Sequence, residues 1–344
     1  MNLPVIMIGT QRSGSNLLRL ILNQIPTLVA PHPPHILQRF SPLLSCYKDL
    51  KETICFELLI EHVSQLVELN PVPWTGVDLN RKDIFNRCQE RSLIAIFKSI
   101  YDIYAESKGV KNWCCKSLAN INYMPGINAY FNSYFQGIKY LWIYRDGRDV
   151  ATSFTKAIVG EKHFYHLARE WSQTQILALE MRKNLGENQL FSLSYEALTQ
   201  NTESVLKSLC DFLEVPYTSS MLDFHQSQEA YSTAAASNLW SEVINPIKSN
   251  NTKKFLNYSN QEELRIFELI AGDVLEILGY ERKFTKVGET YNFTAEEIEQ
   301  FNLVNQQRKQ QIKETIEPGD RERREKQENL LKSIASQYFS VKDS

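Results

Sequence analysis

The sequence lacks long hydrophobic runs and a strong excess of charge of either sign. Its 344 residues include 38 Lys and Arg against 40 Asp and Glu, a formal net charge of -2, so no nucleic-acid partner is expected. No apolar run approaches the length of a membrane span. The N-terminal apolar run is interrupted at Gly9 and Arg12, unlike the hydrophobic region of a signal peptide. These absences predict a cytoplasmic protein with no membrane span.

Disulfide and metal-ligand patterns are missing as well. The six cysteines show no C-x-x-C spacing, and a chain of this length does not depend on disulfides to stabilise its core. His163 and His166 are three residues apart in a helical stretch, but no third ligand accompanies them. We therefore expect reduced thiols and no bound metal.

The most informative feature that is present is a stretch near the N-terminus rich in glycine and serine. An apolar run at residues 5–8 precedes it, and leucines at helical spacing follow from Leu17, which predicts a strand, a loop and a helix. The first amides of that helix lack intrahelical partners and lie at the positive end of its dipole. The loop is therefore a candidate site for a phosphate or sulfate. Its candidate ligands are Gln11, Arg12, Ser13, Gly14, Ser15 and Asn16.

This loop differs from a Walker A loop, in which a lysine follows the second glycine. Gly9 and Gly14 match the two glycines, but Ser15 stands where the lysine is required. The cation is instead Arg12, within the loop. The difference argues against ordinary ATP and magnesium chemistry. Taken alone, the pattern also fits a simple strand-to-helix turn with an N-cap.

Four short apolar runs, each next to a helical pattern, predict an α/β fold with a mostly parallel central sheet flanked by helices. Ligands of such sheets bind beyond the carboxyl ends of the strands, where Arg12, Lys116 and Arg145 fall. The runs are residues 5–8, 113–115, 140–144 and 190–193.

Two segments do not follow this alternation of strands and helices. Residues 31–111 have a mainly helical pattern and are too long for a simple crossover between two strands. Residues 286–344 are charged and rich in glutamine, which predicts a helical tail that is solvated or binds a partner. The tail is also the candidate surface for a homodimer.

A second predicted strand, turn and helix start lies at residues 139–154. Arg145 leaves the strand, Asp149 falls in the first turn of the new helix, and Ser153 follows one turn later. An arginine fork and a hydroxyl converging from these positions would hold a second phosphate. Taken alone, the same residues also fit surface ion pairs at a helix start.

Together the two motifs resemble the sulfotransferase family that uses 3′-phosphoadenosine 5′-phosphosulfate. Residues 11–16 are similar to the family's 5′-phosphosulfate loop, and residues 145–153 are similar to its 3′-phosphate motif. The loop is closer to the branch with an Arg-Ser-Gly loop than to the cytosolic branch with a Lys-Thr-His sequence. Two further matches are Tyr195, like a family tyrosine beside the nucleotide, and Lys248, in a segment like the loop that closes over the 3′-phosphate.

The resemblance covers roughly residues 4–280 and implies a P-loop-like sulfotransferase domain at residues 1–285, with residues 31–111 on the acceptor side and a tail at 286–344. It implies transfer of a sulfuryl group to a hydroxyl or amine without a metal, and release of adenosine 3′,5′-bisphosphate. A small-molecule acceptor and a protein or carrier-bound acceptor both fit the motifs.

Sulfuryl transfer needs positive charge at the bridging oxygen of the leaving nucleotide and a base for the acceptor proton. By the resemblance, Arg12 supplies the charge, and Lys116 matches a family lysine that contacts the sulfuryl region. The histidine of the Lys-Thr-His branch is missing, because Leu118 stands in its place. His32 and His35, in a proline-stiffened loop beyond the first helix, are the candidate bases. The sequence does not separate them.

Two other functions stay open at this point. One is an ATP- and magnesium-dependent P-loop phosphotransferase, which the missing Walker lysine disfavours. The other is a catalytically silent nucleotide-binding protein, which is favoured if neither His32 nor His35 lies in the cleft.

Overall fold

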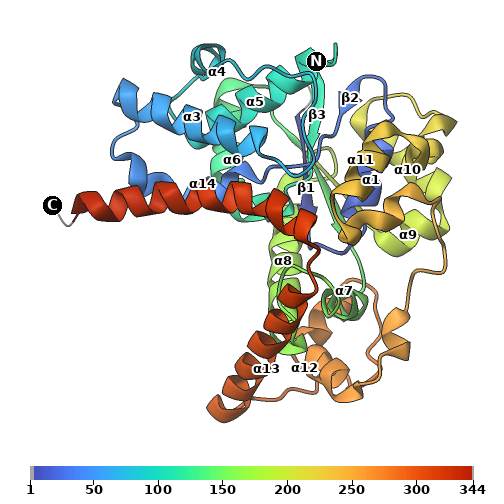
Figure 1. Cartoon of the computed structure of the whole chain (residues 1–344). Coiled ribbons are helices and arrows are strands. Elements are labelled where there is room, and N and C mark those ends of the chain that lie inside the picture. The colour runs from blue at the N-terminus through green and yellow to red at the C-terminus, as the bar shows by residue number, and fades with distance from the viewer. Residues whose placement is uncertain (1–3, 343–344) are drawn as a thin grey trace.

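A five-stranded parallel sheet lies at the centre of the computed structural model, which describes residues 4–342 (Figure 1). The strand order is β2-β3-β1-β4-β5, and every neighbouring pair is parallel. The predicted α/β fold and its four predicted strands are confirmed. A fifth strand, β2, escapes the prediction because its two residues are too few to show a periodic pattern. The strands are β1 (Pro4–Gly9), β2 (Leu28–Val29), β3 (Asn112–Cys115), β4 (Lys139–Tyr144) and β5 (Leu190–Ser194).

The central strand β1 is buried along its whole length. Its side chains alternate between two cores, because Ile6 and Ile8 pack on one face while Val5 and Met7 pack on the other. Both faces are covered, so the strand reads as a continuous apolar run. At its end, Gly9 has a φ of 137°, and a Cβ there would lie 2.1 Å from the carbonyl oxygen of Ile143. Only glycine fits where β1 turns into the loop.

The larger core lies between the sheet and the helices of the long insertion at 31–111 (Figure 1). Aromatic side chains such as Phe56 and Phe97 fill it, so the apolar residues of this segment serve largely for core packing. The elements here are α2 (Ile36–Phe40), η1 (Ser41–Tyr47), α3 (Thr53–Glu68), α4 (Arg81–Arg87), α5 (Leu93–Ser107), η2 (Leu118–Tyr123) and α6 (Met124–Tyr134).

The opposite face and the end of the sheet carry two smaller cores. Figure 1 shows α1 (Ser15–Leu22) among the yellow helices on one side, with α7, α8 and α12 near the sheet's end. On the opposite face are α9 (Tyr195–Gln200), α10 (Thr202–Leu213), η3 (Ser219–Gln226), α11 (Gln228–Ala236) and η4 (Asn238–Ile244). At the end are α7 (Gly147–Phe154), α8 (Phe164–Leu185), η5 (Lys254–Asn257) and α12 (Gln261–Ile277).

The charged tail forms two helices, α13 (Ala295–Glu314) and α14 (Pro318–Lys342), and both pack on the rest of the chain (Figure 1). Asn305 accepts hydrogen bonds from the backbone amides of Lys162 and His163. In α14, Gln327 donates to the carbonyl of Leu66 at 2.7 Å, and Ile334 joins the larger core. The predicted helices are present and most of their residues are exposed, but scattered positions are buried against the rest of the chain, which the sequence analysis did not predict. Their few buried positions are too sparse to give α14 an apolar stripe. A homodimer through the tail stays a prediction.

Within residues 4–342, no helix is both long enough and apolar enough to cross a membrane.

Candidate functional site

The glycine-rich loop connects β1 to α1 and leaves the first amides of α1 free. Gly14 is the N-cap of α1 in a left-handed conformation with a φ of 84°, and it offers no side chain to cap the helix. The hydroxyl of Ser13 turns inward to that of Thr10, 2.9 Å away, so it supports the loop. The helix therefore presents unpaired N–H groups and the positive end of its dipole, as an anion-binding turn does.

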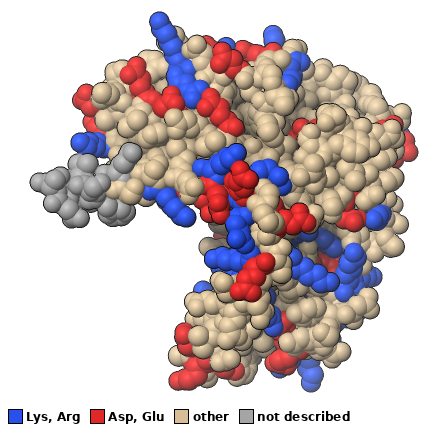
Figure 2. Space-filling view, in the orientation of Figure 1, with Lys and Arg blue, Asp and Glu red and all other residues tan. Residues whose placement is uncertain are grey.

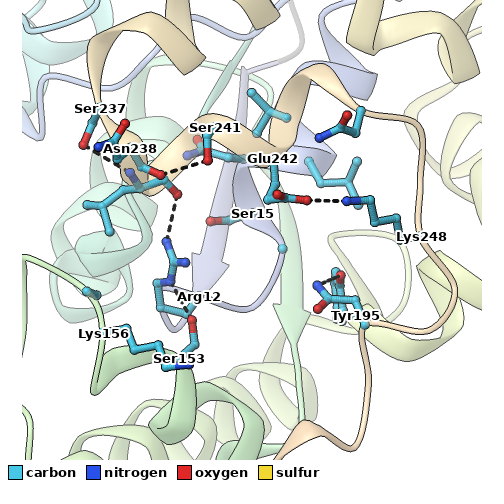
Figure 3. A pocket seen from close by; sticks show the side chains of 18 of the residues that line it. Arg12, Ser15, Ser153, Lys156, Tyr195, Ser237, Asn238, Ser241, Glu242 and Lys248 are labelled. Atoms are coloured by element: carbon cyan, nitrogen blue, oxygen red, sulfur yellow. Dashed lines mark hydrogen bonds and ion pairs between the residues drawn. The ribbon is translucent and has the colours of Figure 1, made fainter.

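A cavity of about 630 Å³ opens at this loop (Figure 3). Its volume is in the range of sites that hold a small organic ligand. We call it the loop cavity. Figure 3 shows Arg12, Ser153 and Lys156 at one side, with Tyr195 and Lys248 at the other. Gln11 is exposed and Ser13 is buried, and neither lines the wall. The expected nucleotide-binding residues that do line it are Arg12, Gly14, Ser15, Asn16, Arg145, Ser153, Tyr195 and Lys248.

Tyr195 explains why the loop requires glycine at position 14. A Cβ on Gly14 would lie 2.3 Å from the Cδ2 atom of the Tyr195 ring. The ring is held by its hydroxyl, which accepts a hydrogen bond from Asn251 at 2.7 Å. Tyr195 begins α9 directly after β5. The loop after β1 is thus packed against the residue that follows β5.

Arg12 crosses the loop cavity from the first motif to the second. Its Nε donates to the hydroxyl of Ser153 at 3.0 Å, and an Nη atom donates to the carbonyl of Leu239 at 3.3 Å. Burial, and next the charge of Arg145, lower the pKa of Arg12. An anion between the two guanidiniums would relieve their repulsion.

Arg145 connects the second motif to the first through hydrogen bonds. It donates to the carbonyl oxygens of Arg12 at 3.2 Å and Asn251 at 2.7 Å, and to the carboxylate of Asp149 at 3.2 Å. Its guanidinium lies 4.5 Å from the ring centre of Tyr195. Its Nε, however, is buried and has no partner among the described residues. A buried donor without a partner is costly, so this atom suits an anionic ligand in the loop cavity.

The two aspartates of the second motif already have partners. Asp149 accepts from the amide of Phe255 at 2.9 Å as well as from Arg145. Asp146 caps α7 by accepting from the amide of Arg148 and pairs with its guanidinium at 2.7 Å. Residues 4–342 contain no group of three or more His, Cys, Asp or Glu side chains suited to hold a metal ion.

Lys116 and the two candidate histidines lie together, beside Asn16 and apart from the cavity wall. Lys116 donates to the side-chain oxygen of Asn16 at 3.0 Å, and the Nδ1 of His35 lies 2.9 Å from the hydroxyl of Ser117. We call His32, His35, Lys116 and Ser117 the histidine cluster. Burial, followed by the charge of Arg19, lowers the pKa of Lys116 to about 7.

The two histidines differ in their surroundings. His32 is only 5% exposed, its ring centre is 4.6 Å from that of Trp240, and its Nε2 is buried without a partner among the described residues. Burial, then Lys116, lowers its pKa well below the usual value. His35 is the N-cap residue of α2, and its side chain is partly exposed. The same two causes lower the pKa of His35 to about 3.

No motif in the sequence marks two further parts of the cavity wall. One is the η4 segment, and the other is the turn between α13 and α14. Asp320 at the start of α14 accepts from the hydroxyl of Ser237 at 2.6 Å, and Glu317 accepts from Asn238 at 2.9 Å. Lys248, which was expected at the 3′-phosphate, is exposed and pairs with Glu242 at 2.6 Å. The η4 segment and the turn before α14 carry no recognisable motif, so only the structure shows that they line the cavity.

Comparisons with known proteins agree with this arrangement. A family model described as "Sulfotransferase family" matches residues 4–219, which include the loop, the second motif and Tyr195. The chain belongs to the sulfotransferase family. Membership implies sulfuryl transfer from 3′-phosphoadenosine 5′-phosphosulfate to an acceptor. No curated protein matches this sulfotransferase.

Two solved structures share its fold. The sulfotransferase domain of the Synechococcus PCC 7002 olefin synthase has 18% identity and a TM-score of 0.53, over 82% of this chain and 95% of that one. The sulfotransferase domain from the curacin biosynthetic pathway has 20% identity and a TM-score of 0.54, over 82% and 100%. At these identities the likeness supports the fold of this sulfotransferase.

Proposed function

We propose that the loop cavity binds 3′-phosphoadenosine 5′-phosphosulfate in a defined orientation. The amides of residues 14–16 and Arg12 hold the 5′-phosphosulfate, and Arg145 and Ser153 hold the 3′-phosphate. The observation that carries this proposal is the single cavity lined by both motifs, with the buried Arg145 Nε lacking a partner beside it. We also propose that the chain belongs to the branch with an Arg-Ser-Gly loop, on the basis of residues 12–14.

Arg12 acts through its charge. A guanidinium stays protonated even with a lowered pKa, so it neutralises the developing charge on the leaving oxygen and donates no proton. Lys116 lies next to the loop that carries Arg12, where it donates a hydrogen bond to the side chain of Asn16. A sulfuryl group beside it would favour the protonated amine, since an opposite charge raises the pKa of a lysine.

We propose His35 as the base that takes the acceptor proton. Burial and the charge of Lys116 lower the pKa of His35 to about 3, so this role requires the bound anionic donor to offset the charge of Lys116 and raise that pKa. If its Nδ1–H donates to the hydroxyl of Ser117, 2.9 Å away, the Nε2 atom is free to accept a proton. His35 is partly exposed, whereas Trp240 covers the ring of His32. His32 then packs within the cluster and helps to hold it in place, and it does not contact the acceptor.

The reaction proceeds without a metal ion in this proposal. Phosphoryl transfer to or from ATP needs magnesium held by a hydroxyl and a carboxylate near the phosphates. Asp149, the carboxylate of the 3′-phosphate motif that lines the loop cavity, accepts hydrogen bonds from Arg145 and from the amide of Phe255. Charge neutralisation is therefore assigned to Arg12 and Lys116.

We propose a cytoplasmic location. The six cysteines are free, and three of them, including the adjacent Cys114 and Cys115, are buried. Free thiols fit a reducing compartment.

Calorimetric titration tests the donor assignment. We expect adenosine 3′,5′-bisphosphate to bind without magnesium, and more tightly than Mg-ATP. Arg145→Ala should weaken this binding, while Lys207→Ala, an exposed charge on α10, serves as the control. A preference for Mg-ATP would identify a phosphotransferase instead. Tight binding without transfer to any acceptor would identify a silent nucleotide-binding protein.

A further inference from the structure

The η4 segment contacts both the loop cavity and the histidine cluster. On the cavity side, the carbonyl of Leu239 accepts a hydrogen bond from Arg12 at 3.3 Å. On the cluster side, the ring centre of the next residue, Trp240, lies 4.6 Å from that of His32. Figure 3 shows the labelled residues of η4 across the cavity from Ser153, with Arg12 between them. One short segment therefore covers part of the donor site and part of the cluster.

The histidine cluster beside Trp240 is nearly closed to water. The exposed fractions of His32, Lys116 and Ser117 are 5%, 8% and 1%. The Nε2 atom of His32 is buried and has no partner among the described residues, whereas a water molecule that could enter would bond to it. A sulfuryl donor reacts with water when water reaches it, so an enzyme that transfers this group must exclude water from the site.

Asp320, at the start of α14, is connected to η4 through both oxygens of its carboxylate. One oxygen accepts from the hydroxyl of Ser237, the N-cap residue of η4, at 2.6 Å. The other accepts from the Nε of Arg324 at 2.7 Å, and the guanidinium of Arg324 lies 5.5 Å from the ring centre of Trp240. Asp320 and Ser237 are both buried. A buried carboxylate with both oxygens bonded fixes its partners in one arrangement.

Two more hydrogen bonds join the start of α14 to the same segment. Arg323 donates to the carbonyl of Ala236 at 2.8 Å, and Asn238 donates to Glu317 at 2.9 Å. Figure 2 shows the surface hollowed beside α14, with acidic and basic side chains gathered at the inner end of the hollow. All of these residues lie beyond 4–219, the part that matches the family model, so family membership assigns them no role.

We propose that Asp320 is a positioning residue, which holds η4 in place so that the sulfuryl group passes to the acceptor and not to water. This inference rests on the proposed function and adds what decides between the two nucleophiles. In both reactions the bond between sulfur and the bridging oxygen of the donor breaks. In transfer, the acceptor oxygen bonds to sulfur and its proton passes to His35. In hydrolysis, a water oxygen bonds to sulfur, and sulfate, adenosine 3′,5′-bisphosphate and a proton are released.

The first measurement needs no acceptor. The donor, radiolabelled in its sulfuryl group, is supplied at saturation, and the release of free sulfate is followed. Asp320→Asn keeps the size of the side chain but removes its charge, and it should speed this release about tenfold or more, because a charge-assisted hydrogen bond is lost. Ser237→Ala and Arg324→Gln each break one of the two connections and should give smaller increases. Glu322→Gln removes an exposed charge from the same helix and should match the wild type.

The second measurement reports the position of η4 itself. Trp240 is half-buried, whereas every other tryptophan is at most 9% exposed, so acrylamide quenches fluorescence mainly at Trp240. Asp320→Asn should increase this quenching, and the further change Trp240→Phe should remove the increase. Calorimetric binding of adenosine 3′,5′-bisphosphate shows that each variant is folded. If Asp320→Asn does not fold, Ser237→Ala takes its place in both measurements.

The outcomes separate this inference from the proposed function. If the wild type does not bind adenosine 3′,5′-bisphosphate, the proposed function fails and this inference falls with it. If the wild type binds the nucleotide but Asp320→Asn releases sulfate no faster than Glu322→Gln, the role of Asp320 is wrong and the donor assignment stands. Faster release with unchanged quenching of Trp240 would also overturn that role, because η4 would not have moved.

Discussion

The loop cavity and the histidine cluster are neighbours that are built in opposite ways. The cavity is lined by residues that follow β1, β4 and β5, three adjacent parallel strands whose carboxyl ends meet at one edge. The cluster takes its residues from the insertion at 31–111 and the end of β3, and it is flanked by η4 and α14.

The difference shows where each kind of recognition is encoded. An anion site at a helix start depends on backbone amides and on a short stretch of sequence. A site for an acceptor depends on side chains that only packing brings together. Substitutions in the loop cavity should therefore have large effects on nucleotide binding. Substitutions around the histidine cluster should affect binding, proton transfer and stability independently of one another.

The largest effect is expected from Gly14→Ala. The new Cβ would lie 2.3 Å from the Tyr195 ring at a φ of 84°, so the loop must move. We expect a loss of about 3 to 5 kcal/mol in unfolding free energy from the overpacking and backbone strain, and no measurable binding of adenosine 3′,5′-bisphosphate. Urea unfolding and calorimetry check both.

Gly279→Ala is the matched control for this change. Its φ is also 84°, but a Cβ there meets nothing within 4 Å, so only the conformational cost of about 1 kcal/mol is expected. Equal losses in the two variants would show that contact with Tyr195 does not matter.

The next effect separates the two histidines. His35→Gln should lower kcat by about 10² to 10⁴, the usual contribution of a general base, with nucleotide affinity unchanged. His32→Gln should change kcat much less, because Trp240 covers its ring. Rates measured at saturating donor give the comparison. Full activity in both variants would place the base elsewhere, and the reverse order would exchange their roles.

A smaller effect, on binding, is expected for the arginines of the loop cavity. Arg145→Ala should weaken binding of adenosine 3′,5′-bisphosphate by about 10- to 100-fold, the value of a charge-assisted hydrogen bond to phosphate. Arg12→Ala should lower turnover in addition to binding, because it meets the leaving oxygen. Calorimetry and initial rates distinguish them. Unchanged donor affinity in Arg145→Ala would contradict the 3′-phosphate site.

The dependence of stability on pH gives a further, smaller test of the histidine cluster. Burial, then Lys116, lowers the pKa of His35 from 6.5 to about 3. The unfolded chain takes up this proton below pH 6.5, but the folded chain does so only near pH 3. The stability that a neutral His35 provides is therefore complete above pH 6.5 and falls as the pH drops towards 3.

When the pH is lowered from about 7.5 to about 5, the unfolding free energy of the wild type should fall by about 1 to 2 kcal/mol more than that of His35→Gln. Urea unfolding at the two pH values measures this. An equal loss in the two proteins would mean that the imidazole is protonated in the folded state.

The smallest effect is expected where the tail meets the insertion. Gln327→Ala removes the hydrogen bond from α14 to the Leu66 carbonyl and should cost about 1 kcal/mol of unfolding free energy. Lys326→Ala is the exposed neighbour for control. An unfolding free energy equal to that of the wild type would show that this hydrogen bond does not stabilise the contact between α14 and the insertion.

Much of the fold followed from local patterns. The four strands read as apolar runs because helices cover both faces of a parallel sheet. Gly14 and Arg145 were found because they lie in strand-turn-helix segments of recognisable spacing. β2 gave no pattern in two residues. The tail was misread because α14 buries only scattered residues such as Ile334.

The sequence alone therefore determined four of the five strands and the two motifs that line the loop cavity, because both follow from patterns within a few consecutive residues. It named His32 and His35 without separating them. Only the tertiary structure places Trp240 against His32 and Ser117 beside His35. It also brings Arg324 of the tail close to Trp240. These contacts join residues more than 80 positions apart, and long-range packing leaves no periodic trace in the chain.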